Sequence, residues 1–157
     1  MKKQKGFRDY ANELLDFIEQ SPSCYHVAAN LAEKFSKAGF EELKEMDDWA
    51  IEPGGKYFVV RNDSSIIAFG VPELLVKGFH MAAAHSDSPT FKLKENPEEV
   101  TDRKYLKLNT EKYGGMILST WLDRPLSVAG RVAVLKQKKI GTKLVNIDKD
   151  LLVIPNV

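Results

Sequence analysis

Cysteine is nearly absent from this sequence, and neither sign of charge is in excess. Cys24 is the only cysteine among 157 residues, which excludes an internal disulfide, a redox pair and a thiolate metal cluster, so we expect a reducing, cytoplasmic setting. The 23 basic residues almost balance the 22 acidic ones, and the net charge of +1 argues against nucleic acid as a partner. Long apolar runs are also missing, and a polar segment follows the basic start, so the sequence predicts neither a secretion signal nor a membrane span.

The first forty residues predict two helices. In the first helix, over residues 7–20, apolar side chains recur at three- and four-residue spacing: Tyr10, Leu14, Phe17 and Ile18. Ser23 can cap a second helix over residues 24–38, and Gly39 supplies the stop at its end.

From residue 56 onward the pattern becomes that of strands. A hairpin is predicted from residues 56–61 and 65–69, joined by a turn at Asn62-Asp63. Residues 78–84 are predicted to form the next strand, buried between layers because small alanines lie on both of its faces. Further strands are predicted in the second half, at residues 90–94, 105–109, 129–137 and 144–147.

This order of elements predicts an α/β fold that passes into a β-rich region. Residues 95–99 are the best linker candidate, which divides the chain into residues 1–94, the N-terminal part of an α/β domain, and residues 95–157, the start of a β-rich subdomain. The apolar residues 151–157 predict a chain that ends within a structure, because domain ends tend to be polar.

The main chemical signal is the triplet His85-Ser86-Asp87 at the end of the predicted strand over residues 78–84. Residues i and i+2 of a strand project to the same side, about 7 Å apart at their backbones. This spacing suits a metal ligand and its orienting carboxylate, since a ligating imidazole needs a partner that fixes its tautomer. The triplet alone also fits an ordinary strand-end histidine followed by an Asx-turn residue before Pro89.

Separated motifs lie in order along the whole chain, and they are Ser21–Ala28, Ala38–Leu43, Gly55–Phe58, Ala84–Pro89, Tyr113–Gly115, Thr120–Arg124 and Ala129–Val132. Together they resemble the opening portion of the M18 family of metallo-aminopeptidases, the family of aspartyl aminopeptidase. The resemblance implies the N-terminal part of an α/β/α zinc-exopeptidase sheet sandwich. It also implies that the β-rich stretch begins an inserted subdomain of the kind that the family uses for dimer assembly.

The resemblance further implies a site with two metal ions, normally zinc, a bridging water that attacks the peptide carbonyl, and a glutamate as general base. On this basis His85 is a metal ligand and Asp87 is the catalytic aspartate that orients it, with Ser86 where the family usually has Thr. The remaining ligands of the family belong to segments beyond Val157. The implied activity is release of N-terminal residues, with acidic residues as one option, from peptide substrates by a homo-oligomer.

Other candidate side chains have plain structural interpretations. Asp123, beside Arg124, is interpreted as an ion-pair partner or a turn residue rather than as the bridging metal ligand. His80 would point to the opposite face of the strand from His85, where packing is its expected role.

Two residues at the start of the second helix are interpreted in the same way. His26 is an interface residue of that helix, and Cys24 is a helix-entry residue. The glycine-containing segment Tyr113–Gly115 is interpreted as a turn between strands, and Lys136–Lys139 as the charged turn of a hairpin.

Three functions therefore remain as hypotheses: an M18-type aminopeptidase, a related di-metal deacylase, and an assembly module without catalysis. The ordered motifs outside the triplet favour the first. A dinuclear site needs about five protein side chains, and this chain supplies one ligand and one orienting carboxylate. The isolated chain is therefore predicted to bind zinc weakly and to be inactive.

Overall fold

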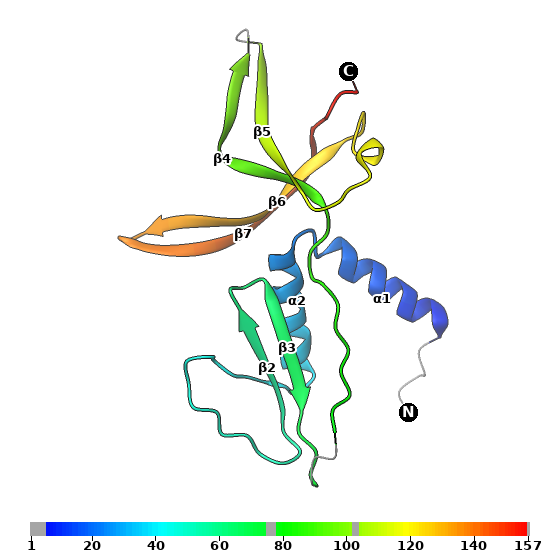
Figure 1. Ribbon diagram of the computed structural model, residues 1–157, viewed down its shortest axis with the longest axis vertical. Helices are drawn as coiled ribbons and strands as arrows, with labels where there is room; N and C mark the ends of the chain where they lie inside the picture. The colour runs from blue at the N-terminus through cyan, green and yellow to red at the C-terminus, as the bar shows by residue number, and fades with distance from the viewer. Residues whose placement is uncertain (1–5, 75–77, 102–103, 157) are drawn as a thin grey trace. The chain divides into compact units, whose positions relative to one another are not determined.

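The computed structural model describes residues 6–74, 78–101 and 104–156. The elements, in chain order, are α1 (Phe7–Glu19), α2 (Cys24–Lys37), β1 (Glu41–Glu42), β2 (Lys56–Arg61), β3 (Ser65–Gly70), β4 (Thr90–Thr101), β5 (Tyr105–Tyr113), a 3-10 helix (Leu118–Thr120), β6 (Leu126–Lys136) and β7 (Lys139–Leu152) (Figure 1). The chain forms two compact units. The first comprises Met1–Ser86 and Val128–Asp148, and the second comprises Asp87–Ser127 and Lys149–Val157.

The two predicted helices of the first unit are confirmed. The carboxylate of Asp9 accepts a hydrogen bond from the backbone N–H of Gly6, 2.7 Å away, and so satisfies a donor just before α1. The second helix, α2, follows Ser23 and ends where Gly39 adopts a positive φ of 81°, a conformation that glycine reaches without a steric penalty. Within the described ranges, no helix combines the length and the apolar composition that crossing a membrane requires.

The predicted hairpin is also confirmed, as β2 and β3. These strands pair antiparallel with Val59 opposite Ile67, and β1 adds a short parallel pairing to β2. Arg61 is paired with Ser65, so three residues, Asn62, Asp63 and Ser64, connect the strands. Asn62 and Asp63 have left-handed φ values of 52° and 56°, as in the turns that suit the twist of a hairpin.

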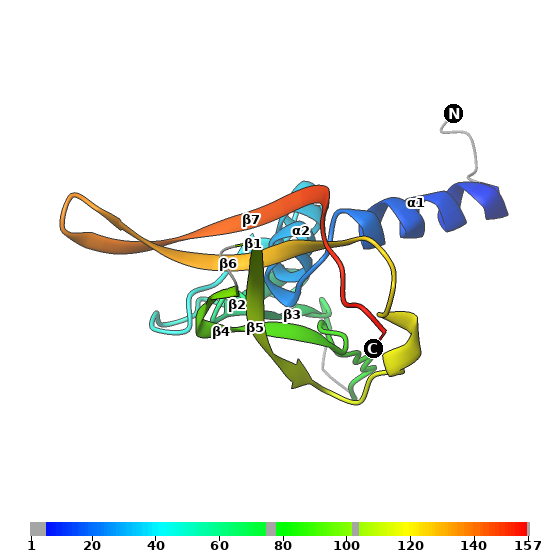
Figure 2. The same ribbon diagram turned by 90° about the horizontal axis from the view of Figure 1, so that it is seen from above.

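Both faces of β2 are covered. On one face Phe58, the largest fully buried side chain described, stacks against Phe35 of α2, with 6.0 Å between the ring centroids, and α2 lies along the sheet in both views (Figures 1 and 2). On the other face Tyr57 and Val59 form a buried cluster with Leu43. The core that holds the hairpin therefore lies between α2 and the segment that follows β1.

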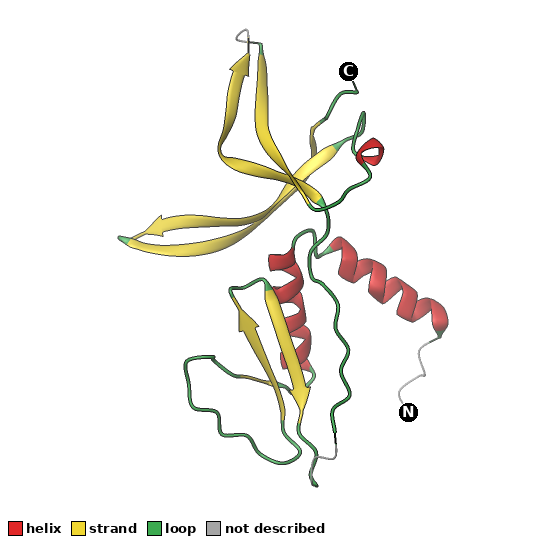
Figure 3. Cartoon of the chain, in the orientation of Figure 1, coloured by secondary structure: helices red, strands yellow, loops and turns green. Residues whose placement is uncertain are grey.

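The predicted strand over residues 78–84 is wrong. This stretch has no regular structure and is exposed along its length, with Phe79 at 85% and Met81 at 90% exposure, and Figure 3 draws it as a loop. A strand needs a neighbour for its backbone donors and acceptors, and no described strand pairs with these residues. Small apolar residues alone do not supply that neighbour.

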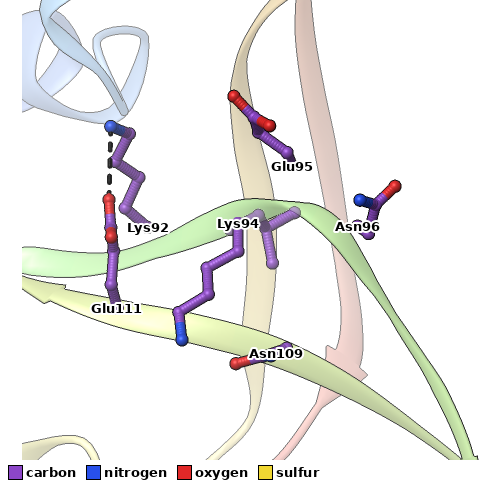
Figure 4. Close-up of a pocket in the computed structure, with 7 residues that line it drawn as sticks. Lys92, Lys94, Glu95, Asn96, Asn109 and Glu111 are labelled. Carbon is purple, nitrogen blue, oxygen red and sulfur yellow. Dashed lines mark ion pairs between the residues drawn. The ribbon is translucent and has the colours of Figure 1, made fainter.

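The predicted linker at residues 95–99 is also wrong, because these residues lie inside β4 of the second unit. The β4–β5 ribbon is antiparallel, and its register shifts between Leu93, opposite Thr110, and Glu98, opposite Leu108. Pro97 has no N–H to donate and falls within this irregularity, where a strand tolerates proline. Figure 4 shows the bulged residues across from Asn109. The division of the chain at residue 94 stays a prediction.

The last two strands, β6 and β7, form a second long ribbon and extend the strands predicted at residues 129–137 and 144–147. Gln137 and Lys138 make the turn between them with φ values of 49° and 64°. The charged hairpin turn predicted at Lys136–Lys139 is thus confirmed.

Candidate functional site

His85 lies in the irregular segment that precedes β4, and its side chain is exposed. Its neighbour Ser86 is half-buried, and the Ser86 hydroxyl donates a hydrogen bond to the backbone carbonyl of Ser64, 2.9 Å away. Ser64 is the last residue of the turn between β2 and β3. The segment that carries the candidate metal ligand is therefore tied to the end of the hairpin, although it is not a strand.

The same turn is held by an arginine from β6. The guanidinium of Arg131 donates to the carbonyl of Asn62 at 2.8 Å and to the carboxylate of Asp63 at 3.0 Å. It also lies 4.2 Å from the ring centroid of Tyr25 in α2, a favourable cation–π distance. Left-handed residues are less stable than extended ones, and these contacts fix the turn that anchors Ser86.

Asp87 is half-buried at the start of the second unit, and its Oδ2 accepts a hydrogen bond from the hydroxyl of Tyr113. Tyr113 is the last residue of β5 and lies opposite Thr90, the first residue of β4. The next residue, Gly114, has a φ of 72°. Residues 114–115 form a bend, whereas Tyr113, which was predicted to lie in a turn between strands, belongs to β5 itself. Its hydroxyl also has a contact that the sequence did not reveal.

The donor atoms present make up only part of a metal site. Among the residues whose structure is described, no group of three or more His, Cys, Asp or Glu side chains lies close enough together to hold a metal ion. One imidazole and one carboxylate fit the start of a zinc site, which takes at least three protein ligands. Ligation by His85 and its orientation by Asp87 stay predictions.

Asp123 is a turn residue, as one of its two interpretations predicted. It has a φ of 52°, its N–H donates to the carbonyl of Ile154, and its Oδ1 accepts from the N–H of Asn156, both at 2.9 Å. Arg124 instead donates to the carbonyl of Thr120 at 3.2 Å. The carboxylate of Asp123 thus holds the segment after β7 in place.

The remaining candidates behave as structural residues. His26 is buried in α2, where its Nδ1 is hydrogen-bonded to the hydroxyl of Ser23 at 2.7 Å, and this burial lowers the pKa of the imidazole. Cys24 is a free, half-buried thiol at the first position of α2. His80 is exposed in the irregular segment, so the argument from alternating strand faces does not apply to it.

The sequence matches a model of the aminopeptidase I zinc metalloprotease family (M18) over residues 17–157. A probable M18 family aminopeptidase 2 of Clostridium novyi is 52% identical over 153 residues, which is 94% of this chain and 35% of that protein. The chain therefore spans about a third of the length of this relative.

Solved structures of similar fold lead to the same family. The chain is similar to a protein in the cryo-EM structure of the Ape4 and Nbr1 complex (TM-score 0.89, 44% identity, 96% of this chain and 29% of that one). It is also similar to the mApe1 dodecamer of S. cerevisiae (TM-score 0.88, 31% identity, 96% of this chain and 36% of that one). These matches confirm the predicted α/β fold class, and the chain belongs to the M18 family of aminopeptidase I zinc metalloproteases.

Proposed function

We propose that the protein containing this sequence is a zinc-dependent aminopeptidase that releases N-terminal residues from peptides. The observation that carries this proposal is the family match over residues 17–157, which includes the triplet His85-Ser86-Asp87. The proposal extends to acidic N-terminal residues as the preferred substrate class, on the resemblance to aspartyl aminopeptidase.

In this proposal His85 supplies one imidazole ligand and Asp87 orients it. Ser86 and the β2–β3 turn hold the backbone beside the imidazole, and Tyr113 holds the carboxylate. Zinc, when bound, supplies a water ligand whose pKa is lowered toward about 7, which makes hydroxide accessible at neutral pH. We propose two ions per site, with the other ligands contributed by parts of the protein outside this sequence.

We further propose that residues 1–157 alone neither bind zinc tightly nor hydrolyse aminoacyl substrates. Support comes from the absence of any cluster of three ligating side chains in the described part of the chain. Further support comes from the Clostridium novyi relative, because this chain matches only 35% of that protein.

Two measurements on two proteins test these proposals. Zinc titration calorimetry and an assay with aspartyl, glutamyl, leucyl and lysyl p-nitroanilides are run on two proteins. One is residues 1–157, and the other is the protein that we propose contains this sequence, called the longer protein below. We expect zinc-dependent turnover from the longer protein alone, fastest on the acidic substrates. Strong zinc-dependent turnover by residues 1–157 would refute the incomplete site, and no turnover by either protein would refute the aminopeptidase.

We also propose that the longer protein is a homo-oligomer, because the similar S. cerevisiae mApe1 is a dodecamer. Sedimentation velocity of the longer protein tests this proposal directly. A single monomeric species at micromolar concentration would contradict it.

A further inference from the structure

We infer that Tyr113 is a positioning residue for Asp87: its hydroxyl holds the carboxylate in the orientation in which Asp87 acts on His85. This inference rests on the proposed function, which assigns Asp87 that action. It gives a role to the tyrosine of the Tyr113–Gly115 segment, which the sequence placed only in a turn.

The hydrogen bond itself suits this role. The phenol of Tyr113 donates to Oδ2 of Asp87, and a bond to an ionised acceptor is about twice as strong as one between neutral groups. Asp87 as a residue is half-buried, although the bond itself is exposed. With Oδ2 held, rotation of the carboxylate is restricted and its direction is set by the position of the phenol.

The position of the phenol is set in turn by the β4–β5 ribbon. Tyr113 is paired with Thr90 at the end of the ladder, and Asp87 lies three residues before Thr90. Beyond the ladder, Gly114 passes close to Pro89: a Cβ at Gly114 would lie 3.5 Å from the Cα of Pro89. The two segments therefore run side by side past the last backbone pair, which brings the donor to the acceptor.

Both partners lie in the second compact unit, so the contact is built by local pairing. Phe91, beside Thr90 in β4, makes an edge-to-face contact with Trp121, with 5.5 Å between the ring centroids, and this contact further fixes that end of the ribbon. Tyr113 as a residue is 44% exposed, so removing only its hydroxyl oxygen should leave packing nearly unchanged.

The test uses the longer protein and separates Tyr113 from Asp87. We expect Tyr113→Phe to lower kcat about 10-fold or more, the loss associated with one hydrogen bond to a charged group, with little change in KM. In an Asp87→Asn background the same substitution should have no further effect, because the tyrosine acts through the carboxylate. Tyr105→Phe, at the other end of β5, is the matched control and should retain wild-type kinetics.

A second readout does not depend on activity. In residues 1–157 we expect the 13C chemical shift of Tyr113 Cζ, which responds to hydrogen bonding of the phenol, to change in Asp87→Ala, which removes the acceptor. The same shift should be unchanged in Tyr105→Phe. Tyr113→Phe should still be folded at the assay temperature, shown by wild-type circular dichroism and a cooperative melt, so that a loss of kcat is not a loss of folded protein.

The outcomes distinguish the inference from the proposed function. If Asp87→Asn abolishes turnover while Tyr113→Phe retains wild-type kcat, the positioning role is refuted and the proposed function stands. If Tyr113→Phe lowers kcat by the same factor in the wild-type and Asp87→Asn backgrounds, the positioning role is also refuted. If Asp87→Asn retains full turnover, the proposed role of Asp87 itself fails.

Discussion

At the scale of single residues, His26 gives the chain a predictable response to pH. Burial lowers the pKa of the folded imidazole below its usual 6.5, so the unfolded chain binds more protons once the pH falls below that value. The free energy of unfolding should therefore decline as the pH falls from about 7 through the folded pKa.

Urea unfolding of residues 1–157 at a series of pH values measures this slope. We expect His26→Gln to flatten it, and His80→Asn, which removes an exposed imidazole, to retain it. An unchanged slope in His26→Gln would assign the pH dependence to other groups.

Ser86 offers a second test at this scale, because its hydroxyl ties the triplet to the β2–β3 turn. Ser86→Ala should lower the free energy of unfolding by about 1 kcal/mol, the usual value of one hydrogen bond, whereas Ser86→Thr keeps the donor. In the longer protein we expect zinc affinity to fall in Ser86→Ala and to be retained in Ser86→Thr. Equal affinities in both variants would show that the anchor does not matter for binding.

Some residues of the candidate site could be predicted from the sequence, and others could not. His85 and Asp87 are two positions apart and lie in a recognisable motif, so both could be named from the sequence. The contact of Tyr113 with Asp87 spans 26 residues and depends on the register of β4 with β5. No local pattern specifies that register, and for the same reason the contact of Arg131 with Asp63 could not be foreseen.

At the scale of elements, the turn between β2 and β3 depends on the geometry of Arg131 and not only on its charge. Arg131→Lys keeps the charge but loses the planar fork that reaches Asn62 and Asp63 together. We expect it to lower the free energy of unfolding by about 1 kcal/mol, measured by urea denaturation. The control is Arg124→Lys. The guanidinium of Arg124 donates to the backbone carbonyl of Thr120, so we expect this variant to lose less free energy of unfolding than Arg131→Lys.

The turn between β6 and β7 carries strain that can be relieved. Lys138 has a φ of 64°, which favours glycine, so Lys138→Gly should raise the free energy of unfolding by about 0.5 kcal/mol. Lys139→Gly is the matched control: Lys139 is the first residue of β7, where glycine only adds flexibility, and we expect a decrease. Thermal melts measure both variants: Lys138→Gly should melt at a higher temperature than the wild type and Lys139→Gly at a lower one. A lower melting temperature for Lys138→Gly would contradict the relief of backbone strain.

Elements with local signals were predicted well, and elements that need distant partners were not. Apolar periodicity, the stop at Gly39 and the Asn62-Asp63 turn indicate α1, α2 and the β2–β3 hairpin within a few residues. The predicted side-chain cap by Ser23 is absent, because its hydroxyl bonds to His26 instead. Residues 78–84 have strand-like composition but no described strand beside them. Residues 95–99 have linker-like composition but lie opposite β5, whose pairing carries them through a bulge.

At the scale of the whole molecule, little apolar surface is withdrawn from water. In the described part of the chain five hydrophobic side chains are buried, namely Ala28, Leu43, Tyr57, Phe58 and Val59, while large ones such as Phe7 and Met81 are 90% exposed. Buried apolar area is the main source of folding stability, so residues 1–157 should be only marginally stable.

We therefore expect residues 1–157 to bind the dye ANS, to associate as concentration rises and to melt well below the longer protein. Sedimentation velocity and calorimetry on both proteins check these expectations. A compact monomer that melts at the same temperature as the longer protein would contradict them.

The anchoring of the β2–β3 turn also bears on where this chain can be engineered. Hairpin turns are usually safe places for an inserted tag, because the strands on either side tolerate a longer connection. Here an insertion at Asn62-Asp63 would displace the atoms that Arg131 and Ser86 bind, and would move His85 with them. The turn at Gln137-Lys138 is the better position for a label, since its strands carry none of the triplet's anchors except Arg131, which lies well before the turn in β6.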